Sequence, residues 1–234
     1  MADHNEAIAI LGGTGDLGTG LAIRWAKAGH HIIIGSRTQE KADKAVADLR
    51  AISPTTQADA MVNAAAAAAG QIVVLTVPAE HQLATLAGVK EQLKGKILID
   101  VTVPLVPPKV GTVQLPPEGS AGKRAQDLLG DEVNVVTAFQ NIAAHLLQHD
   151  VVIECDVLVA GNKKAARQKV IDLAAEAGMR AWHAGPIENS AAAEALTSIL
   201  IQINRQGGIT HSGIKIIGQD AGTAGTDAGT VASH

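Results

Sequence analysis

A glycine-rich turn near the N-terminus has the composition of a phosphate-binding site. The segment Gly13-Thr14-Gly15-Asp16-Leu17-Gly18 follows the apolar run Ala7–Leu11 and opens the helix-like segment Leu17–Ala28. A strand, a glycine turn and a helix in this order are typical of dinucleotide binding, because the glycines let the backbone approach a pyrophosphate and the helix N-terminus offers unpaired N–H groups. The alternative is an ordinary glycine turn. We predict a dinucleotide site here.

The residues after the next predicted strand, His31–Ile34, indicate which dinucleotide binds. An NAD enzyme usually places Asp or Glu at the end of this strand, where the carboxylate binds the ribose hydroxyls. Here the strand runs into Ser36 and Arg37, and Lys41 lies one helical turn further on. A hydroxyl, a guanidinium and an ammonium suit a phosphate. We therefore predict a clamp for the 2′-phosphate of NADP(H); the alternative is a solvated basic patch at the start of the next helix.

Composition excludes several other classes of protein. The 234-residue chain has a net charge of −4, so it lacks the basic surface of a nucleic-acid-binding protein. Its single cysteine, Cys155, cannot form an intramolecular disulfide and fits a reducing compartment. We see neither a secretory leader nor an apolar run long enough to cross a membrane, and we expect a cytoplasmic protein without membrane contact. The chain contains no tyrosine, which excludes the tyrosine acid–base mechanism of short-chain dehydrogenases.

Apolar strands alternate with helical segments along the first part of the chain. After the first two strands we predict further strands at residues 56–61, 71–77, 96–101 and 132–137, with helices at 41–51, 63–69 and 81–93 and a loop at 111–122. Nearly continuous apolar strands separated by helices indicate a parallel sheet covered on both faces, whose ligands bind beyond the carboxyl ends of the strands. The fold class predicted is α/β, a Rossmann-like doubly wound parallel sheet with a smaller C-terminal α/β domain.

A change in composition follows His145, and residues 149–155 are a possible link within the second part of the chain. We predict an NADP-binding domain over residues 1–138, a smaller domain over 139–218 and a mobile tail over 219–234. The smaller domain should contain strands at 156–161 and 179–183 and helices at 163–177 and 191–203. The last helix is too apolar to face water all round, so we expect it to pack on the first domain or on a second subunit, and we expect a homodimer.

The residues in order resemble the family of F420-dependent NADP reductases over about residues 6 to 218. The motifs that carry the resemblance are Leu11–Gly18, Gly35-Ser36-Arg37 with Lys41, Leu75–His81, Ala138–Ile142, Asp156–Gly161, Ala184-Gly185-Pro186 and Gly213-Ile214-Lys215. The resemblance implies direct hydride transfer between reduced coenzyme F420 and NADP. It implies contacts with NADP or F420 at Thr14, Gly15, Asp16, Leu17, Ser36, Arg37, Lys41, Val77, Ala79, Leu83, Val103, Ala144 and Ser212, the last through its backbone to F420.

Hydride transfer between two bound cofactors requires positioning rather than an acid or a nucleophile. We therefore assign no catalytic acid or base, and we take Gln140 and Ile142 as candidates for positioning the two rings; simple core packing is the alternative. His145 and His149 share a helix face, but no third ligand is evident, so we predict no metal site. Two other functions stay open: an NADP-dependent reductase of a small carbonyl or imine, and a non-catalytic NADP-binding redox sensor.

Overall fold

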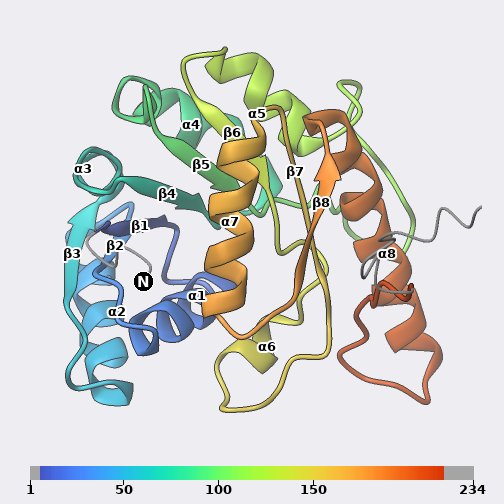
Figure 1. Ribbon diagram of the computed structural model, residues 1–234, viewed down its shortest axis with the longest axis horizontal. Helices are drawn as coiled ribbons and strands as arrows, with labels where there is room; N and C mark the ends of the chain where they lie inside the picture. The colour runs from blue at the N-terminus through green and yellow to red at the C-terminus, as the bar shows by residue number, and fades with distance from the viewer. Residues whose placement is uncertain (1–5, 219–234) are drawn as a thin grey trace, which may run out of the picture.

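The structure, a computed structural model, describes residues 6–218 and contains one eight-stranded sheet (Figure 1). The strand order is β3-β2-β1-β4-β5-β6-β7-β8. Strands β1 to β6 are parallel, and their order is that of a dinucleotide-binding fold. The strands are β1 (Ile8–Leu11), β2 (Ile32–Ser36), β3 (Ala58–Val62), β4 (Ile72–Leu75), β5 (Ile97–Asp100), β6 (Asn134–Thr137), β7 (Val157–Gly161) and β8 (Ala181–Gly185). The predicted α/β fold is confirmed.

Helices cover both faces of this sheet, as the nearly continuous apolar strands predict. One apolar core contains Ile8 and Ile10 of β1 together with residues of α1 (Asp16–Lys27), α2 (Gln39–Ile52) and α7 (Lys164–Glu176). The other contains Ala9 and Leu11 with residues of α3 (Asn63–Ala69), α4 (Ala79–Leu93) and α5 (Ala121–Leu129). Because successive side chains of a strand point to opposite faces, the four buried residues of β1 serve both cores.

The C-terminal strands continue the same sheet but reverse its direction. Strand β7 is antiparallel to β6, whereas β8 is parallel to β7. The sequence had suggested a parallel sheet, and this part of the prediction is wrong at β7. The pairing joins Val136 to Gly161 and Thr137 to Ala160 only, so β7 overlaps β6 at one end and extends beyond its carboxyl end. The connection between these strands, with α6 (Ala144–Leu147), therefore lies past the carboxyl edge, where ligands bind in such sheets.

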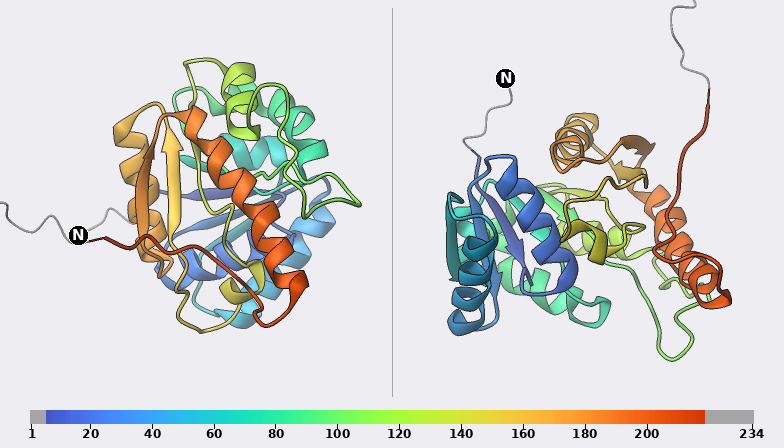
Figure 2. Two further views of the ribbon diagram at one scale, coloured as in Figure 1. Left: turned by 90° about the vertical axis from the view of Figure 1, so that its right-hand side faces the viewer. Right: turned by 90° about the horizontal axis from the view of Figure 1, so that it is seen from below.

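The helix α8 (Ser190–Gln206) follows a short 3-10 turn (Ile187–Asn189) and packs on α5 and β7. Figure 2 shows α8 at the opposite end of the molecule from α2 and β3. The predicted domain boundary at residue 138 falls directly after β6, and that division stays a prediction because β7 and β8 belong to the same sheet. The predicted tail, 219–234, lies outside the described residues. No helix within residues 6–218 has the length and apolarity to span a membrane.

Two helices are absent from the sequence-based assignment. Helix α5 begins at Ala121, inside the predicted loop, because the Ser120 hydroxyl caps it by accepting a bond of 2.9 Å from the Lys123 N–H. Helix α6 is only four residues long, too short to give a periodic pattern. The other predicted elements are present, with ends displaced by one to a few residues.

Candidate functional site: a dinucleotide cleft at the carboxyl edge of the sheet

The glycine turn joins β1 to α1 in a conformation that only its glycines allow. Gly12 has a φ of +75°, and its N–H donates to the Gly35 carbonyl at 3.0 Å, which fixes the turn to the end of β2. The N–H of Thr19 makes the first helical bond, to the Gly15 carbonyl at 2.8 Å. The amides of the first turn of α1 therefore have no helical partner and are available to an anion.

Two further glycines of the turn have opposite surroundings. A Cβ atom on Gly18 would lie 2.7 Å from Thr76 Oγ1 and 2.8 Å from Gly13 Cα, so this glycine lets α1 pack directly on the turn and on the end of β4. A Cβ atom on Gly15 would have its nearest neighbour, the Gly12 carbonyl oxygen, at 3.7 Å. Gly15 therefore faces an open space, which suits the close approach of a ligand to the backbone.

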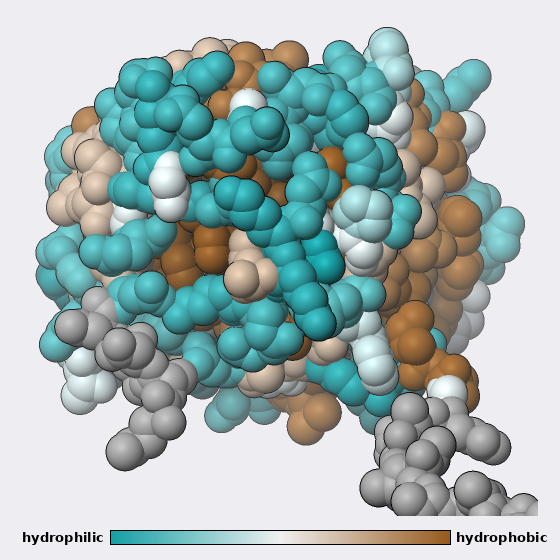
Figure 3. Space-filling view, turned by 45° about the horizontal axis from the view of Figure 1, so that its top comes forward, coloured by the Kyte–Doolittle hydropathy of each residue, from teal (hydrophilic) through white to brown (hydrophobic). Residues whose placement is uncertain are grey.

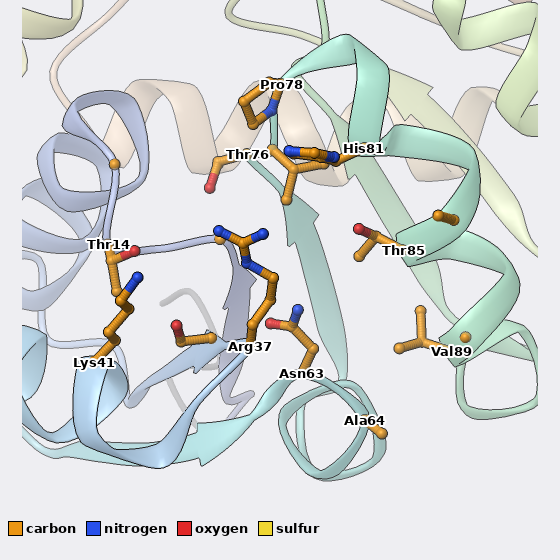
Figure 4. Close-up of a pocket in the computed structure, with 16 residues that line it drawn as sticks. Thr14, Arg37, Lys41, Asn63, Ala64, Thr76, Pro78, His81, Thr85 and Val89 are labelled. Atoms are coloured by element: carbon orange, nitrogen blue, oxygen red, sulfur yellow. The ribbon is translucent and has the colours of Figure 1, made fainter.

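This open space is a cleft of about 510 Å³ between the turn, β2, α3 and α4 (Figure 4). Its volume lies in the usual range of small-molecule sites. Its lining residues are Gly12, Thr14, Gly15, Ser36, Arg37, Lys41, Asn63, Ala64, Thr76, Val77, Pro78, His81, Ala84, Thr85, Gly88 and Val89. Six residues expected to bind a cofactor, Thr14, Gly15, Ser36, Arg37, Lys41 and Val77, are therefore brought together in one cleft.

The charge at one end of the cleft fits a phosphate. Ser36 is buried at the end of β2, whereas Arg37 and Lys41 are exposed and project into the cleft beside Thr14 (Figure 4). The residues that line the cleft include two cations and no carboxylate. The chemistry of this donor set therefore fits the 2′-phosphate of NADP, and it lacks the strand-end carboxylate that a ribose diol would use.

Sequence reasoning missed the opposite wall of the cleft, which α3 and α4 form. His81, Thr85 and Gly88 recur at helical spacing on one face of α4, and Asn63 begins α3. The Oδ1 atom of Asn63 is buried and has no hydrogen-bond partner among the described residues. The spacing on α4 was visible in the sequence, but only the sheet order shows which of its faces meets the cleft.

A buried polar network lies behind the cleft and joins α4, α5 and β5. Asp100 accepts bonds from the Gln82 side chain and, at 2.9 Å, from the Thr102 N–H. Gln82 also donates to the Ala121 carbonyl at 3.0 Å and accepts two bonds from the Arg124 guanidinium, at 2.6 and 3.0 Å. Burial raises the pKa of the Asp100 carboxyl above its usual value, although these hydrogen bonds oppose the shift. The network fixes the β5 end next to α4.

Helix α8 is tied to the same region by Glu194. Its carboxyl group is buried and accepts bonds from the N–H groups of Ala121, at 2.7 Å, and Gly122, at 3.0 Å, at the start of α5. Burial raises the pKa of Glu194 to about 7, and the nearby Asp100 carboxyl acts in the same direction. A glutamate at a helix N-terminus thus links the C-terminal helix to the carboxyl edge of the sheet.

The two positioning candidates lie in the connection after β6. Phe139 has a φ of +70°, a conformation that is strained for a bulky residue, and it is almost completely buried. The Gln140 side chain donates to the Asp100 carbonyl at 3.1 Å, while its Oε1 atom is buried without a partner among the described residues. Ile142 packs in the core. An unpaired amide oxygen beside the β5 end is consistent with a ligand contact at Gln140.

Arg24 of α1 fixes the segment that carries Ala144. Its guanidinium donates to the carbonyls of Leu146, Leu147, His149 and Val151, at 2.6 to 3.1 Å. The Gln148 amide donates to the Asp16 carbonyl at 3.1 Å. Helix α6 is therefore held against the start of α1, next to the glycine turn.

Similarity to known proteins shows the family of this chain. Residues 7–104 match a family described as NADP oxidoreductase, coenzyme F420-dependent. The chain is 42% identical over 218 residues to the F420-dependent NADP reductase of Methanocaldococcus jannaschii, a match that covers 89% of this chain and 97% of that protein. This chain belongs to the F420-dependent NADP reductase family. The reductase of the same name from Methanothermobacter thermautotrophicus is 40% identical, with 89% of this chain and 94% of that protein covered.

Solved structures of lower identity show the same fold. A hypothetical protein from Sinorhizobium meliloti has a TM-score of 0.65 at 21% identity, covering 79% of this chain and 86% of that one. A reductive aminase from Aspergillus terreus has a TM-score of 0.59 at 19% identity, and the match covers 85% of this chain and 61% of that one. At these identities the likeness establishes the arrangement of elements only.

The other residues that the resemblance to the F420-dependent NADP reductase family predicts to contact a cofactor are not among those that line the cleft. Asp16 and Leu17 lie at the start of α1, and Ala144 at the start of α6. Leu83 is exposed on α4, and Val103 is half-buried after β5. Ser212 is held against α8, where its hydroxyl donates to the Leu200 carbonyl at 3.1 Å. Ala79 lines a second cavity. The role of each of these residues stays a prediction.

The histidines that raised the question of a metal pack on one another. The ring centroids of His145 and His149 are 4.4 Å apart, and His211 stacks on His145 at 5.3 Å. Within residues 6–218 no group of three or more His, Cys, Asp or Glu side chains is arranged to hold a metal ion. Cys155 is buried, and burial raises the pKa of its thiol, so it does not have the surroundings of a nucleophile.

Proposed function

We propose that this chain catalyses direct hydride transfer between reduced coenzyme F420 and NADP. The observation that carries the proposal is its identity of 40–42% with reductases of that name over nine-tenths of its length. The cleft supports the NADP half independently, because Arg37 and Lys41 stand at the end of β2 where no carboxylate would repel a 2′-phosphate. The activity makes the chain an oxidoreductase with NADP(H) and F420 as its substrates.

The protein's contribution to this reaction is positioning. Hydride passes between the two cofactors when their rings are in face-to-face contact, so the reaction needs no nucleophile from the chain. The glycine turn and the basic end of β2 would hold NADP along the carboxyl edge of the sheet. Gln140, anchored to the Asp100 carbonyl, would orient the rings with Ile142. We name no general acid or base.

A spectrophotometric assay tests the proposal. Purified protein mixed with NADPH and oxidised F420 should bleach the visible absorbance of F420, and reduced F420 with NADP should restore it. Parallel reactions with NADPH and small imines or carbonyls test the alternative reductase function. If the F420 spectrum stays unchanged while an imine is reduced, the proposal is wrong.

We also propose that the active form is a cytoplasmic homodimer in which α8 lies at the subunit interface. Its inner face packs on α5, but Ile199 and Ile203 are 46% and 40% exposed in the single chain. Figure 3 shows apolar surface along the right-hand side of the molecule, the side on which Figure 1 places α8. Such a patch favours burial against a second subunit. Light scattering after size exclusion measures the mass; a monomer at micromolar concentration would contradict the dimer.

A further inference from the structure

A second cavity adjoins the same turn as the dinucleotide cleft, on its other side. It has a volume of about 520 Å³. Pro78 lines the cleft, whereas Ala79, the next residue, lines the second cavity. Two ligands whose reacting rings must touch need neighbouring cavities that are open to each other at the rings. The turn between β4 and α4 borders both cavities, so they are neighbours.

Arg124 is the one basic side chain among the residues that line this cavity. It is half-buried, and its Nε and Nη2 atoms donate to Gln82 Oε1, while Nη2 also approaches the Ala79 carbonyl at 3.4 Å. These acceptors are neutral, and no carboxylate within residues 6–218 lies at ion-pair distance from the guanidinium. Its neighbour on α5, Lys123, in contrast pairs with Asp127. Arg124 thus brings a fixed positive charge to the cavity; this charge acts on the buried Asp100 carboxyl group behind the cavity but forms no direct ion pair with it.

The rest of the lining is mainly apolar and rich in proline. It consists of Pro104, Leu105, Val106, Pro107, Leu115 and Pro116, together with Ala79, Glu80 and Gln114. The Glu80 side chain is 73% exposed and lies 3.9 Å from the His81 imidazole, so it faces solvent rather than Arg124. A ligand for such a cavity would combine an apolar body with an anionic group, because a partly buried guanidinium gains most from a charged acceptor.

We propose that the second cavity binds the anionic side chain of the deazaflavin substrate through Arg124. This inference rests on the proposed function. The side chain of coenzyme F420 carries a phosphodiester and glutamyl carboxylates, and both are acceptors that match the fork of a guanidinium. The apolar loop 104–107 would cover the part of the ligand next to the ring, and the shared turn would bring the ring toward the nicotinamide end of the cleft.

A purely structural role for Arg124 would consist of its hydrogen bonds and of the attraction between its charge and the buried Asp100 carboxyl group, both inside the protein. Its protein partners, the Gln82 amide oxygen and the Ala79 carbonyl, accept equally well from a neutral donor. Loss of these contacts would lower the stability of the protein and affect every deazaflavin equally, whereas loss of a ligand contact would weaken only a ligand that carries an anionic side chain. The two roles make different predictions for the substitution Arg124→Gln.

The test compares Arg124→Gln and Arg124→Lys with the matched control Lys123→Gln, which removes one charge from the same helix outside the cavity. The dissociation constant of F420 is measured by its fluorescence for each variant. The measurement is repeated with the form that keeps the phosphate and lactate but lacks glutamates, and with the deazaflavin that lacks the whole side chain. NADPH affinity and thermal stability are measured alongside.

We expect Arg124→Gln to weaken F420 about tenfold or more, equivalent to about 1.4 kcal/mol. The F420 affinity of Arg124→Lys should lie between those of the parent protein and Arg124→Gln. The affinities for the tail-less deazaflavin and for NADPH should not change. If Arg124→Gln weakens the form without glutamates as much as it weakens F420, the acceptor is the phosphate or the lactate. If it does not weaken that form, the acceptors are the glutamate carboxylates. Equal losses for tailed and tail-less deazaflavins, or no loss, overturn the inference even if the enzyme turns over F420. Bound but unreacted F420 would overturn the proposed function alone, and F420 that does not bind at all overturns both.

Discussion

The amide of Gln82 donates a hydrogen bond of 2.5 Å to the carboxyl group of Asp100, and solvent reaches neither side chain to any extent. This pair joins the helix that lines the dinucleotide cleft to the carboxyl end of the central strand β5. Gln82 uses its other atoms for Ala121 and Arg124, so one buried amide coordinates three elements around both cavities. The geometry of the site therefore depends on a residue that contacts neither cavity.

Replacing this amide should destabilise the fold. Gln82→Leu would leave the Oδ2 atom of the buried Asp100 carboxyl and the Ala121 carbonyl without the donor that Gln82 supplies, and each unsatisfied group costs about 1–3 kcal/mol. We expect a loss of about 2–5 kcal/mol in the free energy of unfolding, measured by urea denaturation. The control is Gln168→Leu, whose side chain makes an exposed bond to Asp172. Equal stability of the two variants would mean that the network does not support the fold.

Arg37 should distinguish the two nicotinamide dinucleotides. Arg37→Ala removes a charge-assisted bond worth about 1.5–3 kcal/mol, which corresponds to a loss of roughly 10- to 150-fold in NADPH affinity. NADH, which lacks the 2′-phosphate, should lose little. Lys44→Ala is the control, because Lys44 lies on α2 in an exposed ion pair with Asp48. Titration calorimetry with both dinucleotides measures the difference, and equal losses for NADPH and NADH would exclude a phosphate clamp.

The stability of the protein should fall as the pH rises past the ordinary pKa of glutamate. Burial raises the pKa of Glu194 from 4.5 to about 7 in the folded protein, so the folded state holds this proton more tightly than the unfolded state. The associated stability is complete below pH 4.5 and declines until about pH 7, by an amount of the order of 3 kcal/mol. Denaturation midpoints from pH 4.5 to 8 measure this slope. It should be smaller in Glu194→Gln, and an identical slope in both proteins would contradict the assignment.

How far the sequence predicted this site depends on the range of the interactions involved. The glycine turn and Ser36, Arg37 and Lys41 were identified because local spacing alone determines their place at the ends of β1 and β2. The predicted α/β class followed from apolar strands of ordinary length. These features are encoded by neighbouring residues.

The features that sequence reasoning missed depend on contacts between distant residues. Asn63 and His81 line the same cleft because β3 and β4 lie on either side of the β2–β1 pair. No local sequence pattern predicts this order of strands. Arg124 was not considered because α5 begins with a glycine-containing, polar segment that resembles a loop. The reversal at β7 likewise depends on the pairing of Thr137 with Ala160, two residues separated by the whole connection that carries Gln140.

The Asp156 carboxylate, directly before β7, should lose its contribution to the stability of the protein at low pH. Burial acts to raise the pKa of Asp156, but bonds from Arg180, the Ile216 N–H and Trp182 outweigh it and lower the pKa to about 2. The stability that these bonds supply is complete above pH 3.8 and is lost as the pH falls toward 2. Asp156→Asn should therefore be less stable than the parent protein at pH 7, and the difference should shrink between pH 4 and 2. A constant difference over this range would contradict the low pKa.

The last prediction concerns how the hydride moves. If transfer is direct, both cofactors must be bound together, so initial-rate kinetics should be sequential, and deuterium from the C4 position of NADPH should appear on reduced F420 without dilution by solvent. Gln140→Ala should slow transfer about tenfold, equivalent to roughly 1.4 kcal/mol, because it removes an anchor to the Asp100 carbonyl and an unpaired amide oxygen. The label should still be retained in this variant, and KM for NADPH should change little, because a positioning residue affects alignment rather than chemistry. Gln126→Ala, which removes a bond to the Gly130 carbonyl on the α5 side, is the matched control. Washout of the label into water would require an exchanging group on the protein, and a site that acts only by positioning would then be excluded.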